Sequence, residues 1–280
     1  MRDAVAINRM ESIDQYLAVS GGRIRFRDEG NGGPVVFLHG WTLDLEMWQP
    51  QVSALCRKFR IIRFDRRGFG LSSGTPDPTQ DVADFRSLLE HLELPQVAVV
   101  GMSQGARLAI HVALSMPQCV SALVLDGPPN PMVADGAGDD EALAMDEFRK
   151  LVRTQGIQAF RQTWLLHPFT ELQSTEIQAR ELLLQMIARY PGHDLTNPVP
   201  SVSHPIDASN LSQLRQPVLV VNGERDTYGR RRAGEELRGA LPNALRALIP
   251  HAGHLANLDN PEFYNDVLSG FLLRQARIAA

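Results

Sequence analysis

The sequence is poor in cysteine. Among its 280 residues only Cys56 and Cys119 are cysteines, which is too few for a disulfide framework, and they lack the close spacing of a zinc-ligand pair. His167, His193 and His204 also lack the spacing that zinc ligation requires. We therefore expect no bound metal, and we expect both thiols to be buried or half-buried.

An excess of charge of one sign is also missing. The chain has 28 Lys and Arg against 32 Asp and Glu, a formal net charge of −4. The one basic cluster, Arg230–Arg232, is followed by Glu235 and Glu236 and predicts a solvated helix start rather than a polyanion site. We therefore expect no nucleic-acid partner.

Long hydrophobic runs are absent as well. No stretch approaches the length of a membrane span, and residues 1–12 lack the apolar core of a signal peptide. These absences predict a cytoplasmic protein that does not enter a membrane. The hydrophobic content, 44% of residues, suffices for one large domain or for a domain with an inserted lobe.

Short apolar runs alternate with amphipathic segments over most of the chain. Residues 13–19 and 23–28 flank a Gly-Gly pair, which is typical of a β-hairpin. Further strands are predicted at 35–38, 61–64, 97–100, 122–125, 218–221 and 244–249, and helices at 81–92, 106–114, 231–241 and 261–274. This alternation predicts an α/β fold with a mostly parallel central sheet flanked by helices.

The alternation stops after Asp126 and resumes at Val218. Between them lie amphipathic helical patterns at 141–160 and 175–190, followed by a proline-rich return at 191–205. We therefore predict a helical cap, residues 127–210, inserted into one core domain formed by residues 1–126 and 211–280.

Residues 101–105 read Gly-Met-Ser-Gln-Gly and lie between a predicted buried strand and a predicted helix. This motif at such a junction is typical of a nucleophile elbow, a strained turn that exposes a serine hydroxyl. A serine nucleophile needs a base, usually a histidine held by a carboxylate. Active groups on open parallel sheets gather at the carboxyl ends of strands, which selects Ser103, Asp226 and His254 as a catalytic triad.

Two of these positions have rivals. Asp126 also ends a predicted strand, and we favour Asp226 because the turn after the strand at 218–221 is the more usual place for the acid. His251 lies three residues before His254. We favour His254 because Gly253 gives its loop room to aim an imidazole inward, whereas His251 directly follows a proline.

Several motifs together resemble the α/β-hydrolase fold superfamily, over residues 13–271 apart from the cap. The chain order Ser, Asp, His is also the order of that superfamily. The closing run 253–262 is especially similar to the 3-oxoadipate enol-lactonases, and the chain also resembles small capped esterases and cofactor-free haloperoxidases or perhydrolases. The motifs are His39-Gly40-Trp41, Asp65-Arg66-Arg67-Gly68-Phe69-Gly70-Leu71-Ser72, the serine motif, Asp226 and Gly253-His254.

The resemblance implies a role for each site residue. Ser103 would be the nucleophile, His254 the general base and Asp226 the carboxylate that orients the histidine. The backbone N–H groups of Trp41 and Gln104 would form the oxyanion hole. The role of Gln104 also follows from its position, because the first N–H groups of a helix have no intrahelical partner and lie in a positive field.

Two neighbouring motifs are expected to be structural. The turn that begins at Asp65 is a brace in the superfamily, and we expect a buried ion pair between Asp65 and Arg67. His39 is expected to support the loop that carries Trp41.

These residues predict a serine hydrolase that cleaves a small carboxylic ester or lactone through an acyl-enzyme, without a cofactor. A carbon–carbon bond hydrolase, a perhydrolase and a non-enzymatic receptor on the same fold are the alternatives. Trp164, Leu166 and Phe169 could line a substrate roof or equally form the core of the cap. We expect the partner to be a small-molecule substrate. The cap should determine which substrates enter the site, while the residues of the core domain carry out the reaction. The sequence does not determine the oligomeric state.

Overall fold

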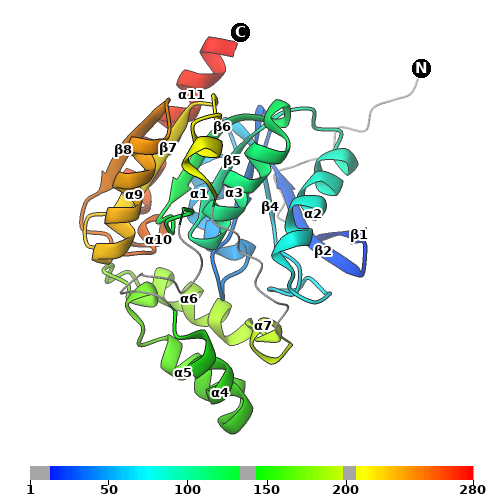
Figure 1. The fold of residues 1–280 in the computed structure, drawn as a ribbon, viewed down its shortest axis with the longest axis vertical. Coiled ribbons are helices and arrows are strands. Elements are labelled where there is room, and N and C mark those ends of the chain that lie inside the picture. Colours follow the sequence, from blue (N-terminus) through cyan, green and yellow to red (C-terminus); the bar gives the residue numbers. More distant parts are fainter. Residues whose placement is uncertain (1–12, 133–142, 198–205, 280) are drawn as a thin grey trace.

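An eight-stranded sheet with the strand order β1-β2-β4-β3-β5-β6-β7-β8 forms the centre of the molecule (Figure 1). The structure is a computed structural model that describes residues 13–132, 143–197 and 206–279. Pairing is antiparallel from β1 to β2 and from β2 to β4, and parallel between all other neighbours. The prediction of a mostly parallel sheet is therefore confirmed. The strands are β1 (Gln15–Val19), β2 (Gly22–Glu29), β3 (Gly33–Leu38), β4 (Phe59–Phe64), β5 (Val97–Met102), β6 (Val120–Asp126), β7 (Val218–Gly223) and β8 (Ala244–Ile249).

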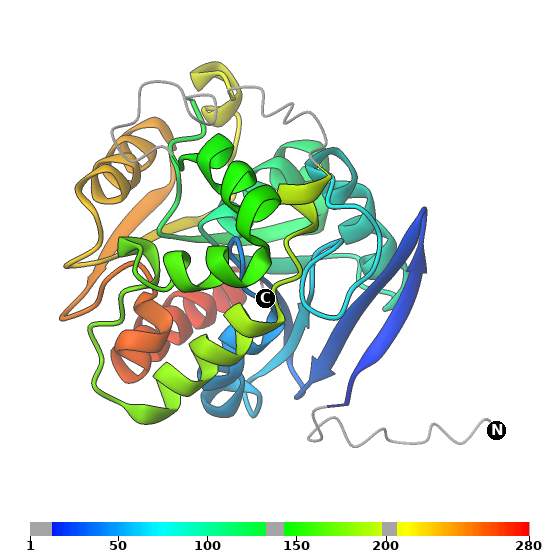
Figure 2. The same cartoon turned by 90° about the horizontal axis from the view of Figure 1, so that it is seen from below.

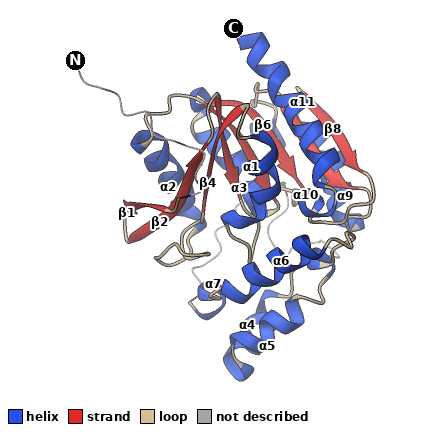
Figure 3. Cartoon of the chain, turned by 180° about the vertical axis from the view of Figure 1, so that it is seen from behind, coloured by secondary structure: helices blue, strands red, loops and turns tan. Residues whose placement is uncertain are grey.

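Helices cover both faces of this sheet (Figures 1 and 3). One face packs against α2 (Pro78–His91), α3 (Gln104–Ser115) and α9 (Tyr228–Ala240), and the other against α1 (Gln49–Leu55) and α11 (Pro261–Ala279), beside the short α10 (Ala256–Asp259). Every residue of β5 and β7 is buried. The continuous apolar runs in these strands follow from that two-sided burial, because an alternating pattern would place polar side chains in a core.

The segment between β6 and β7, which we call the insertion, carries α4 (Met145–Gln155), α5 (Ile157–Trp164), α6 (Ile177–Arg189) and α7 (His193–Thr196). These four helices lie across one end of the sheet (Figures 1 and 2). The predicted helix at 141–160 is two helices, because Gly156 has φ 83° and ends α4. Residues 141–142 and 198–205, where a helix start and a proline-rich return are predicted, lie outside the described residues.

The insertion leaves and rejoins the core at one place. The backbone N–H of Ile206 donates a hydrogen bond to the carbonyl of Pro131 at 2.8 Å, so entry and return lie side by side. After the return, α8 (Ala208–Leu211) packs Leu211 against the core on the α2–α3 side of the sheet. The helices α4–α7 instead extend the core of the other side, through apolar residues that surround Trp41.

Candidate active site

Ser103 occupies a strained turn between β5 and α3. Its φ is 53°, in the left-handed region, and its backbone N–H donates to the carbonyl of Asp126 at 2.8 Å. A Cβ at Gly101 would lie 2.2 Å from the carbonyl oxygen of Gly105, and one at Gly105 would lie 2.3 Å from that of Leu38. The flanking positions therefore require glycine, and the predicted elbow geometry is confirmed.

His254 and Asp226 meet at the ends of neighbouring strands. The imidazole Nδ1 lies 3.0 Å from Asp226 Oδ1, and both side chains are buried. Thr227 donates its backbone N–H to the same carboxylate oxygen at 2.8 Å. A Cβ at Gly127 would lie 2.9 Å from His254 Cε1, so only glycine leaves space for the ring. The contact with the carboxylate uses Nδ1, so Nε2 is the ring nitrogen that does not contact Asp226.

Asp126, the rival acid, lies at the end of β6 and is completely buried. Burial raises its pKa well above the ordinary value, the negative charge of Asp226 raises it further, and the hydroxyl of Tyr264 lowers it. Burial therefore favours the neutral form of Asp126, while Asp226 makes the contact with His254. His251, the rival histidine, is exposed and lies beside Arg225, with Nδ1 3.5 Å from Nη2.

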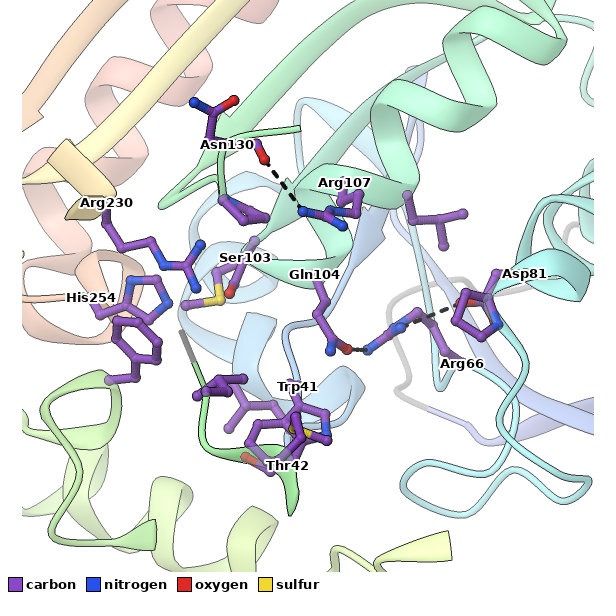
Figure 4. Close-up of a pocket in the computed structure, with 18 of the residues that line it drawn as sticks. Trp41, Thr42, Arg66, Asp81, Ser103, Gln104, Arg107, Asn130, Arg230 and His254 are labelled. Atoms are coloured by element: carbon purple, nitrogen blue, oxygen red, sulfur yellow. Dashed lines mark hydrogen bonds and ion pairs between the residues drawn. The ribbon is translucent and has the colours of Figure 1, made fainter. Parts of the chain in front are cut away.

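A cavity of about 1350 Å³ brings the remaining predicted residues together. Ser103 and His254 line it together with Trp41 and Gln104 (Figure 4). From the insertion, Trp164 and Phe169 line it as well, and the Phe169 ring centroid lies 4.5 Å from that of His254.

Leu166 does not share this position. Its side chain is 87% exposed, and it is not among the residues that line the cavity. Leu166 lies two residues beyond Trp164, the last residue of α5, and it points to solvent. Neither reading of Leu166, as part of a substrate roof or as part of the core of the cap, fits this exposed position.

The Gln104 side chain is fixed by the neighbouring turn. Gln104 is the first residue of α3, and its Oε1 accepts a hydrogen bond from Arg66 Nη2 at 3.0 Å. Arg66 also pairs with Asp81 at 3.4 Å. The backbone N–H of Arg66 donates to His39 Nε2 at 2.9 Å. Burial and the Arg66 charge lower the pKa of His39 well below its ordinary value, so this ring is a neutral support for the loop, as expected.

The loop that carries Trp41 is bonded directly to the insertion. The indole Nε1 of Trp41 donates to Asp194 Oδ2 at 2.6 Å, and that of Trp164 donates to Thr42 Oγ1 at 2.7 Å. Arg189 Nη2 pairs with Asp44 Oδ2 at 2.8 Å. Thr42 has φ 63°, so these bonds hold a strained backbone in place. No local sequence pattern indicates these bonds, because they join residues far apart in the chain.

The predicted ion pair between Asp65 and Arg67 is wrong. Arg67 pairs instead with Asp84 of α2, at 2.7 Å. Asp65 accepts the backbone N–H groups of Leu45 and Leu71, each at 2.8 Å, and its charge partner is Arg25 at 3.4 Å. Each side chain still braces the turn, through a different partner.

The prediction of a solvated basic cluster fails for one of its members. Arg231 and Arg232 are exposed, but Arg230 is 7% exposed and lines the cavity. Arg107, one helical turn after Ser103, lines it too. The available signal for Arg230 was its place at the start of a predicted helix, four residues after the predicted triad acid Asp226.

No helix that the structure describes is both long and apolar enough to cross a bilayer.

Comparison with known proteins places the chain among hydrolases. The model of a family described as "alpha/beta hydrolase fold" matches residues 33–261. The chain is 30% identical to the pimeloyl-(acyl-carrier protein) methyl ester esterase of Nitrosomonas europaea, over 85% of this chain and 95% of that protein. It is 26% identical to 3-oxoadipate enol-lactonase 2 of Acinetobacter baylyi, over 86% and 88%. The crystal structure of a bromoperoxidase from Bacillus anthracis superposes with a TM-score of 0.80 at 26% identity, over 93% of this chain and 99% of that one.

Proposed function

We propose that this chain, which belongs to the α/β-hydrolase family, is a serine hydrolase that cleaves a small carboxylic ester or lactone. The observation that carries the proposal is the pairing of His254 with Asp226 at 3.0 Å, beside a cavity that the strained Ser103 also lines. The relatives from N. europaea and A. baylyi, named for an ester and a lactone, support this choice of substrate.

In the proposed mechanism, Ser103 Oγ attacks the substrate carbonyl while His254 Nε2 takes the hydroxyl proton. Asp226 stabilises the imidazolium that forms and keeps Nδ1 protonated. The tetrahedral intermediate collapses, the carbon–oxygen bond to the leaving group breaks, and His254 returns the proton to the departing alkoxide. A water molecule, deprotonated by the same histidine, then attacks the acyl-enzyme and releases the acid.

The developing oxyanion is proposed to accept two backbone N–H groups, those of Gln104 and Trp41. Gln104 begins α3, so its N–H has no partner within the helix and lies at the positive end of the helix dipole. Trp41 belongs to the loop that is bonded to the insertion. Loss of one such donor typically lowers kcat by about 10²- to 10³-fold.

We propose that the insertion acts as a cap, residues 127–210, over a core formed by residues 1–126 and 211–280. Trp164 and Phe169 would form the wall that faces the substrate, since both line the cavity. An apolar wall beside the histidine would exclude bulk water and so strengthen the electrostatic interactions in the site.

The test is hydrolysis of p-nitrophenyl butyrate and of simple lactones by the wild type and by Ser103→Ala. We expect the variant to lose about 10⁴-fold or more in kcat and to remain folded. Ser53→Ala is the matched control, because Ser53 is exposed on α1, and it should leave the rate unchanged. If Ser103→Ala retained more than about a tenth of the wild-type kcat, against the loss expected for a triad member, Ser103 would not be the nucleophile.

A further inference from the structure

A carboxylate outside the triad holds the loop of residues 250–255, which carries His254 and which we call the histidine loop. Asp259 is the last residue of the short helix α10, five residues after the histidine. Its Oδ2 accepts the backbone N–H of Gly253, which directly precedes His254, at 2.8 Å. The mechanism above gives this carboxylate no part, although it is bonded to the residue next to the proposed general base.

The other oxygen of the same carboxylate holds the insertion. Asp259 Oδ1 accepts the backbone N–H groups of Gln173 and Ser174 at 2.7 and 2.9 Å. These two residues follow Phe169, whose ring centroid lies 4.5 Å from that of His254. One side chain therefore joins the segment that carries the histidine to the segment that carries the aromatic ring packed against it.

The two segments are also in direct contact. A Cβ at Gly253 would lie 3.3 Å from the carbonyl oxygen of Glu171 and 3.4 Å from Asp259 Oδ2. The backbone of the insertion thus packs closely on the histidine loop at this glycine. A change in the hydrogen bonds of Asp259 would therefore act on a packed junction, where a shift of one segment is transmitted to the other.

The carboxylate itself has a fixed position in the core domain. Asn257, two residues before Asp259, and Gln51 of α1 are both completely buried. Gln51 Nε2 donates to the backbone carbonyl of Asn257 at 3.1 Å, and Asn257 Nδ2 donates to Gln51 Oε1 at 3.2 Å. Asn260 Nδ2 donates to the carbonyl of Pro250 at 3.0 Å. These bonds attach α10 to α1 and to the start of the histidine loop, so Asp259 anchors the insertion to a fixed part of the core.

A carboxylate suits this position better than an amide does. An ionised carboxylate only accepts hydrogen bonds and does so through both oxygens, and here it faces three N–H groups. An asparagine would have one accepting oxygen, and its NH₂ group would face an N–H group whichever way the amide is turned. Hydrogen bonds to an ionised acceptor are also about twice as strong as those between neutral groups.

We propose that Asp259 is a positioning residue of the site, which holds the histidine loop and the insertion in the arrangement that places His254 for catalysis. It keeps the imidazole in contact with Asp226 and Phe169. Asp259 acts through Gly253 and does not touch the reacting atoms itself. This inference rests on the proposed function, which makes His254 the general base.

The first measurement is steady-state kinetics with p-nitrophenyl butyrate. A displacement of about 1 Å in a catalytic group lowers the rate by about 10²-fold, so Asp259→Asn should lower kcat by about 10- to 100-fold, with a smaller change in KM. Asp259→Glu keeps the charge and should regain part of the loss. Asp266→Asn, the same change at an exposed position of α11, should keep the wild-type kcat.

Proton NMR separates a positioning role from a purely structural one. The proposed mechanism keeps His254 Nδ1 protonated against Asp226, and an imidazole N–H bonded to a carboxylate gives a far-downfield resonance. Asp226→Asn should remove this resonance and so assigns it. In folded Asp259→Asn the resonance should shift or broaden, and in Asp266→Asn it should not.

Thermal unfolding of each variant checks that the fold is retained. If Asp259→Asn does not fold, Asp259→Glu serves as the same test, with a smaller loss of kcat and a smaller shift of the resonance. A wild-type kcat or an unchanged resonance in the folded variant would overturn the positioning role and leave the hydrolase intact. Absence of ester turnover by the wild type would instead remove the hydrolase, and the resonance alone would then decide whether Asp259 positions His254.

Discussion

Trp164→Phe is the substitution that most directly tests how the insertion affects catalysis. It removes the indole N–H that donates to Thr42 Oγ1 at 2.7 Å and keeps an aromatic ring in the cluster around Trp41. Thr42 is 1% exposed, so water does not readily replace the lost donor. A buried polar group left without its partner costs about 1–3 kcal/mol of unfolding free energy, and urea unfolding should show a loss in that range.

The same change should lower kcat, because Thr42 follows the residue proposed to donate to the oxyanion. A displacement of about 1 Å in a catalytic group lowers the rate by about 10²-fold, so we expect a kcat loss between a few-fold and 10²-fold, with a smaller change in KM. Steady-state kinetics with p-nitrophenyl butyrate measures both constants.

A double-mutant cycle with Thr42→Val isolates the hydrogen bond, since valine has the shape of threonine without the hydroxyl. The kcat losses of the two single variants should not add in the double variant. If Trp164→Phe altered only the ranking of substrates and left kcat intact on a good substrate, the contact would be purely structural. The expectation of a cap that leaves the chemistry alone would then hold.

Three further predictions follow from the geometry of the site. Asp226→Asn should lower kcat by about 10⁴-fold, the loss known for the same change in a related triad, whereas Asp126→Asn should cost far less because Asp226 makes the contact with His254 Nδ1 and burial favours the neutral form of Asp126; kinetics showing a larger loss at Asp126 would transfer the acid role. Phe169→Ala should change the kcat/KM ranking across an ester and lactone panel by about 1–3 kcal/mol, and an unchanged ranking would remove Phe169 from the proposed substrate wall. The pKa of His39 is lowered in the folded protein, so on acidification the histidine is protonated in the unfolded chain before it is protonated in the folded one. The contribution of neutral His39 to the free energy of unfolding is therefore complete above about pH 6.5. Below that pH it falls by up to about 1.4 kcal/mol per pH unit. Urea unfolding at several pH values between 5 and 7 should therefore give a shallower acid-side loss for His39→Gln than for the wild type, and equal slopes would contradict a neutral His39.

Local patterns predicted the sheet because its interior strands carry their own signal. β5 and β7 are buried throughout, which an apolar run already indicates. The strand predicted at 244–249 matches β8 in both bounds. The turn at Ser103 was also predictable, since glycines at 101 and 105 are needed where backbone atoms approach within 2.3 Å of a Cβ position. In each case the cause lies within a few residues of the feature.

Partners that come from distant parts of the chain could not be predicted in this way. Arg67 lies two residues after Asp65, yet it pairs with Asp84 across the turn. A run of three arginines is normally solvated, and only the packing of α9 in the folded chain buries Arg230 while Arg231 and Arg232 stay exposed. Leu166 failed for a related reason: apolar character does not determine the direction in which a residue after a helix points.

The contacts of the insertion with the site divide into two kinds, and each has its own expected effect on kinetics. Asp194, Trp164 and Arg189 hold the loop of residues 41–44 through hydrogen bonds, so changes there should act on the oxyanion position and hence on kcat. Phe169 packs against the His254 ring and lines the cavity, so changes there should act on which substrates fit. Trp164 belongs to both kinds, because it bonds Thr42 and also lines the cavity. Phe keeps most of its apolar surface and loses the N–H, whereas Ala loses both. Comparison of Trp164→Phe with Trp164→Ala therefore separates the two effects at one position: the kcat loss should be present in both variants, and the change in substrate ranking should be large only in the alanine variant.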